Sequence, residues 1–136
     1  MKLIKLYCNQ KFKQITFNRD GGGLNVILAD ILSTSDESNT HNLGKSLLLD
    51  IIDFCLLAKL SNSHWLITTT DSDGAPLFED YVFYLEIELN SGKFVTIRRS
   101  VSQATKIGFL ENNKSAEGYP LFDLPAKQKK PFVRTL

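Results

Sequence analysis

The chain has 136 residues and a mass of 15.3 kDa, the size of one ordinary domain with one hydrophobic core. Apolar residues make up 43% of it and charged residues 23%, as in soluble globular proteins, and the formal net charge is +1. A near-neutral chain has no overall field that attracts nucleic acid or a membrane surface, so the net charge gives no argument for binding to either, and only a local patch such as Lys127, Lys129 and Lys130 could provide one.

The cysteines and the N-terminal segment indicate a cytoplasmic protein. Cys8 and Cys55 lie far apart in the sequence, with no CxxC pair or nearby histidine, which argues against a metal site and fits reduced thiols. No segment reaches the roughly 18 apolar residues that a membrane span needs, and the N-terminus has no targeting pattern.

The first predicted elements are a hairpin and a buried strand. Residues 3–7 and 14–17 have strand-like composition and are joined by a polar turn. Residues 20–23, Asp-Gly-Gly-Gly, predict a second turn, because these glycines precede a strand and do not open a helix. The run from Leu24 to Leu28 is then apolar enough to predict a central strand.

A helix and three strands are predicted in the rest of the chain. Residues 46–58 are apolar on nearly every face, which predicts a helix packed under a sheet and covered on its other side. Residues 81–89 alternate with a period of two, and 94–101 return after a hairpin turn. Residues 107–110 predict a further strand, whereas 111–136 hold three of the four prolines and predict a loop or linker.

Gly44-Lys45-Ser46, directly before the predicted helix, is the motif that carries chemistry. A phosphate-binding loop needs inward N–H groups, a lysine on the β and γ oxygens, a hydroxyl on Mg²⁺ and a helix N-terminus facing the anion. Lys45 is then the charge clamp and Ser46 the Mg²⁺ ligand. Gly44 lets the backbone approach the phosphate, and Leu43 contributes an N–H group.

Two features depart from the pattern G-x-x-x-x-G-K-[ST]. Its first glycine falls on Asn39, a residue type that enters the left-handed region readily, so the loop can still close with some strain. Residues 29–38 separate the predicted strand from the motif, and their carboxylates must point outward or help to hold Mg²⁺. The alternative is a long surface loop in which Gly44 eases packing and Lys45 lies in solvent.

The order of elements resembles the N-terminal lobe of the SMC-like ATPases, the ABC-type heads of chromosome-maintenance and double-strand-break repair proteins. The resemblance is carried by "LIKLYCNQKFKQITF", "LNVILAD", "NTHNLGKSLLLDIIDFCLL" and "YVFYLEIELNSGKFVTIRRSV". It is most specific to an uncharacterised bacterial family of that superfamily, whose loop reads N-x-L-G-K-[ST] after an extended segment.

This resemblance implies an α/β fold, a P-loop NTPase half-domain whose mixed sheet has an antiparallel strand subdomain and a buried P-loop helix. Residues 1–110 are then the lobe, and 111–136 a tail that leads toward a coiled coil and a C-terminal lobe. The implied ligands are ATP and Mg²⁺. The implied contacts, with Ser46 on the metal and the first two near the base, are Phe12, Lys13, Asn39, Asn42, Leu43, Gly44, Lys45, Ser46 and Leu47.

The family's catalytic half is not visible in the sequence. It has a strand ending in adjacent Asp-Glu and a signature loop, whereas Asp50 lies on the P-loop helix and Glu111 follows a weak strand without a second acid. No catalytic residue is assigned, and ATPase activity requires a second lobe or a homodimeric head. The implied role is in DNA repair or phage defence, with DNA reached only through the full assembly.

Two alternatives remain open. A non-catalytic interaction module would keep the fold without nucleotide binding, as Asn39 and the missing second lobe suggest. A small-molecule kinase fits less well, because such folds alternate strands and helices.

Arg98 and Arg99 point to opposite faces of their strand, which predicts solvent or salt-bridge roles for them. His64 is predicted to begin a strand.

Overall fold

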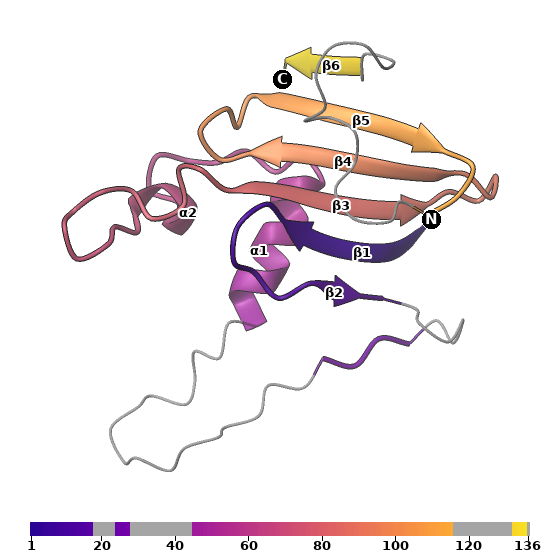
Figure 1. Ribbon diagram of the computed structural model, residues 1–136, viewed down its shortest axis with the longest axis horizontal. Helices are drawn as coiled ribbons and strands as arrows, with labels where there is room; N and C mark the ends of the chain where they lie inside the picture. Colours follow the sequence, from indigo (N-terminus) through magenta and orange to yellow (C-terminus); the bar gives the residue numbers. More distant parts are fainter. Residues whose placement is uncertain (18–23, 28–44, 116–131, 136) are drawn as a thin grey trace.

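A computed structural model describes residues 1–17, 24–27, 45–115 and 132–135 of the chain. These residues form strands and helices that Figure 1 labels in chain order. Their bounds are β1 Lys2–Cys8, β2 Ile15–Thr16, α1 Lys45–Cys55, α2 Trp65–Thr68, β3 Val82–Glu88, β4 Phe94–Ser100, β5 Lys106–Asn112 and β6 Phe132–Thr135.

The strands form one six-stranded sheet in the order β2-β1-β3-β4-β5-β6, and every neighbouring pair is antiparallel. The hairpin predicted between β3 and β4 is confirmed, with Gly92 at φ 78° in its turn. The predicted pairing of β1 with β2 is confirmed as well. Figure 1 shows α1 across one face of the sheet and α2 beside one end of it.

The predicted α/β fold with a mixed sheet is wrong. A mixed sheet contains parallel pairs, whereas every neighbouring pair of strands here is antiparallel. Residues 24–27 lie outside the sheet, with Leu24 80% and Val26 69% exposed. The predicted strand is therefore wrong over these four residues, and Leu28 lies outside the described part of the chain.

The predicted helix is confirmed as α1, but its predicted burial on all sides is wrong. Ile51, Phe54 and Cys55 are at most 4% exposed and share one stripe, because residues three and four apart lie on the same face. Leu49, on the opposite side, is 64% exposed. Among the described residues α1 has one covered face, the face that lies on the sheet.

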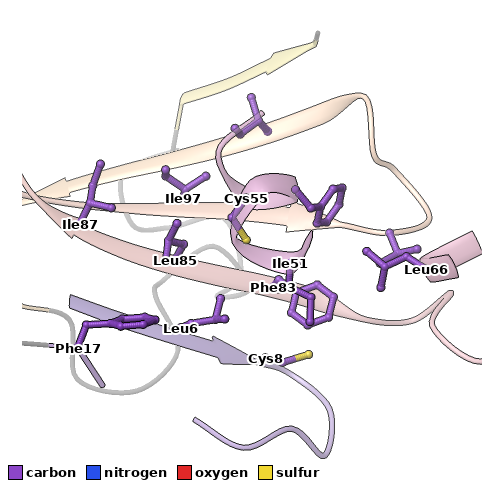
Figure 2. Close-up of a cluster of buried hydrophobic side chains, with 13 residues drawn as sticks. Leu6, Cys8, Phe17, Ile51, Cys55, Leu66, Phe83, Leu85, Ile87 and Ile97 are labelled. Carbon is purple, nitrogen blue, oxygen red and sulfur yellow. The ribbon is translucent and has the colours of Figure 1, made fainter. Parts of the chain in front are cut away.

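The apolar core lies between α1 and the sheet, and Figure 2 shows its side chains. Leu6, Leu85 and Ile97 lie side by side across β1, β3 and β4 and are at most 4% exposed. Full burial of such a side chain contributes about 1.5–3 kcal/mol to the free energy of unfolding. These strands thus form the platform on which α1 rests.

The other face of the sheet is polar and is also buried at its centre. Tyr84 and Glu86 are 0% exposed and Thr96 is 1% exposed. The rings of Tyr7 and Tyr84 stack with their centroids 5.0 Å apart. Ser115 donates a hydrogen bond to Glu86, so the chain after β5 reaches this face. Burial on both faces explains why β3 is buried at consecutive positions.

The C-terminal region adds a strand to the sheet. The strand predicted at 107–110 is confirmed and extends to Asn112 as part of β5. β6 then pairs antiparallel with β5, although prolines and weak periodicity predicted a loop. Neither helix in the described residues is long and apolar enough to cross a membrane.

Candidate functional site

The candidate site is the start of α1, which begins at Lys45, directly after Gly44. The first turn contains no acidic side chain, so the N–H groups and the positive end of the helix dipole are not neutralised there by a carboxylate of the same turn. Ser46 is exposed and Leu47 is 43% exposed. The helix start is thus accessible in the described part of the chain.

The middle of α1 is fixed to the body of the protein through Asp50. The Nε1–H group of Trp65 donates to Oδ2 of Asp50 at 2.8 Å. Trp65 in turn contacts Phe78 edge-on, with ring centroids 5.2 Å apart, and Phe78 contacts Tyr81 at 5.0 Å. The carboxylate is therefore engaged with the indole, one turn after the helix start.

Phe12 and Lys13, the predicted base contacts, lie in the loop between β1 and β2. Phe12 is half-buried and meets the ring of Phe83 edge-on at 5.6 Å. Phe83 also meets Phe54 of α1 edge-on at 6.4 Å, so Phe12 and α1 pack around the same ring. Lys13 is exposed. The fold thus brings this loop toward α1, while contact with a base stays a prediction.

Four of the predicted loop contacts lie outside the described residues: Asn39, Asn42, Leu43 and Gly44. The side chain of Lys45 is not described either. Their assignment to phosphate stays a prediction. Within the described ranges, no cluster of three His, Cys, Asp or Glu side chains is placed to hold a metal ion. The Mg²⁺ contact of Ser46 stays a prediction.

Two residues have roles that differ from those predicted. His64 does not begin a strand: it caps α2, where its Nδ1 accepts a hydrogen bond from the N–H group of Leu66 at 3.2 Å. Arg99 does not lie in solvent, and it forms no salt bridge with the residues that the structure describes. Its guanidinium is buried over the ring of Phe54, 4.2 Å from the centroid. The alternation of Ile97, Arg99 and Val101 on the core face is the sequence signal that indicates this position.

Burial shifts the pKa values of three groups near α1. It raises the pKa of the Cys55 thiol to about 12, against a smaller lowering effect of the Arg99 charge. Burial likewise raises the pKa of Cys8 and lowers that of Arg99. Both thiols are therefore protonated at neutral pH and are poor nucleophiles.

No family model, curated protein or solved structure matches the chain.

Proposed function

We propose that the chain is an ATP-binding module in which the start of α1 receives the phosphates of Mg-ATP. The observation that carries the proposal is the position of the helix start: α1 begins within Gly44-Lys45-Ser46, as a phosphate-binding motif requires. The exposed Ser46 hydroxyl is available to Mg²⁺, and the absence of an acidic side chain from the first turn favours an anion there.

Hydrolysis by this module would require residues from another chain. Phosphoryl transfer depends on a group that positions the attacking water and on charge stabilisation around the γ-phosphate. Asp50 is hydrogen-bonded to Trp65, and Asp53 is exposed two turns after the helix start. A second ATPase lobe or a second copy of the module would supply the missing groups, and DNA would be engaged only by that assembly.

The cytoplasm is the compartment that we propose for this activity. Cys8 and Cys55 are buried thiols and form no disulfide. Such thiols persist where glutathione and thioredoxin keep cysteines reduced. Mg-ATP is also the nucleotide form that such a module would meet there.

The proposal is tested by isothermal titration of Mg-ATP into the chain and into a Lys45→Ala variant. Binding that the substitution abolishes would support the site, and Lys59→Ala, an exposed lysine beyond the other end of α1, is the matched control. A ligand at a hundredfold excess over Kd should also raise the free energy of unfolding by about 2.7 kcal/mol. Absence of binding to the folded wild type, or equal binding to Lys45→Ala, would refute the proposal.

A non-catalytic interaction module is the second candidate, and one observation favours it. Leu24, Val26 and Leu49 are each more than 60% exposed, although large apolar side chains usually find cover. In that case another protein would cover them. Sedimentation at increasing concentration, for the wild type and for a Val26→Asn/Leu49→Gln variant, would detect self-association through these residues.

A further inference from the structure

Arg99 is a buried cation without a carboxylate partner in the described residues. It lies on the helix-covered face of β4, opposite Phe83, and is 1% exposed. Burial of an ionised group is unfavourable unless hydrogen bonds and opposite charge compensate for it. The groups that compensate for the buried charge of Arg99 therefore indicate its role in the fold.

Backbone carbonyl oxygens from three positions surround the guanidinium. Nη1 donates to the carbonyl oxygen of Phe54 and, at 3.0 Å, to that of Ala58, while Nη2 donates to that of Ala104. Phe54 belongs to the last turn of α1, where carbonyl groups lack the regular partner four residues later and the helix dipole is negative. Ala104 lies in the turn between β4 and β5. One side chain thus joins the end of α1 to that turn.

The end of α1 is itself strained at Leu57. The N–H group of Ala58 donates to the carbonyl of Asp53 at 2.9 Å, and the N–H group of Leu57 donates to that of Phe54 at 3.2 Å. This pattern is a Schellman motif, with Leu57 at φ 83° in the position that glycine usually occupies. A leucine persists in this conformation only where surrounding contacts enforce it. Arg99 binds carbonyl groups on both sides of Leu57.

Cys55 lies within this motif, directly after Phe54. Its side chain is 0% exposed, and Figure 2 shows it among the core side chains between α1 and the sheet. A reagent in solvent can reach the thiol only when the end of α1 moves away from the sheet. Cys55 is therefore a native probe of that movement.

We propose that Arg99 is a conformational latch: it holds the left-handed turn at Leu57 closed, joins the end of α1 to the β4–β5 turn, and keeps Cys55 from solvent. This latch operates whether or not the chain binds a nucleotide. Because it spans two segments more than 40 residues apart, it makes the position of the helix end depend on the β4–β5 turn.

The latch is tested by alkylation of Cys55 in the folded protein, with mass spectrometry to separate its peptide from that of Cys8. Loss of hydrogen bonds to a charged group should make Cys55 in Arg99→Met react about tenfold faster or more. Arg99→Lys, which keeps the charge but not the planar fork, should give a smaller increase. Adding Leu57→Gly to Arg99→Met should slow the reaction again, since glycine relieves the strain.

A general loss of stability is distinguished from latch opening by a control and by urea. Ile87→Ala also weakens the core, but Figure 2 shows Ile87 well away from Cys55. Labelling through global unfolding should rise steeply with urea in that control, whereas labelling through local opening should depend on urea only weakly.

Three results would overturn the latch: equal labelling of Arg99→Met and wild type, a steep urea dependence in Arg99→Met, or no slowing by Leu57→Gly. If Arg99→Met does not fold, unchanged labelling of Arg99→Lys overturns it.

Discussion

The two ends of α1 have similar apolar sequences and opposite surroundings. Phe54 and Cys55, in the last turn, are at most 1% exposed and lie beside the buried Arg99. Leu47 and Leu49, near the start, are 43% and 64% exposed. Leucine in a helix therefore does not by itself mean burial, because the outcome depends on which face of the helix lies on the sheet.

This difference is useful for a binding site at the start of the helix. The anchored half holds the helix axis in place through the core, the Asp50 hydrogen bond and Arg99. The accessible half would then present Ser46 and the first N–H groups to the proposed ligand without movement of buried side chains. Sites built on rigid elements hold their geometry better than sites on loops.

The largest expected effect is at the anchored end. Phe54→Ala removes a ring that is 1% exposed and contacts both Phe83 and Arg99, so we expect the free energy of unfolding to fall by about 3–5 kcal/mol. Urea unfolding measures this loss. A loss below about 1 kcal/mol would show that the last turn of α1, where Phe54 lies, is not tightly packed.

Alkaline pH should weaken the same end through Cys55. Its pKa is raised to about 12 in the folded protein, above about 8.5 in an unfolded chain. Below the unfolded value both states keep the proton. Above it the unfolded state loses the proton first, so the free energy of unfolding should fall by about 1.4 kcal/mol per pH unit until about pH 12.

Cys55→Ala isolates this contribution from other groups that titrate at high pH. Urea unfolding between about pH 9 and 11 should show a steeper loss of stability in the wild type than in the variant. Equal slopes would mean that the thiol is not desolvated in the folded protein.

Trp65→Phe should have a moderate effect, since it removes the 2.8 Å hydrogen bond to Asp50 and keeps an aromatic ring beside Phe78. We expect a loss of about 1–2 kcal/mol for a hydrogen bond to a partly buried carboxylate. A double-mutant cycle with Asp50→Ala measures the pair alone, and a coupling energy near zero would contradict the assigned anchor.

The smallest effect is expected at the exposed end. Leu49→Gln should change the free energy of unfolding by no more than about 0.5 kcal/mol, because the side chain is 64% exposed. Asp53→Asn, another exposed position of α1, is the control in the same urea experiment. A loss greater than about 1 kcal/mol would show that Leu49 is covered and would remove the contrast between the two ends.

Local patterns predicted the elements well where they are long and periodic. The alternation over 81–89, the turn at 90–93 and the apolar run after Ser46 correspond to β3, the hairpin and α1. The same reasoning failed at residues 24–27, because an apolar run has the same composition in a central strand as in an exposed extended segment. It also missed β6, whose pairing depends on β5 and not on local periodicity.

The sequence by itself determined the hairpins, the helix and its start at the Gly-Lys-Ser motif, since turns, strands and helices arise from interactions between near neighbours in the chain. Only the tertiary structure decided that the sheet is antiparallel throughout, that α1 is covered on one face, and that Arg99 binds the end of that helix. These features depend on pairings between distant segments. The partners of Arg99 are backbone carbonyl groups, which every residue has, so no acidic side chain in the sequence indicates where the arginine binds.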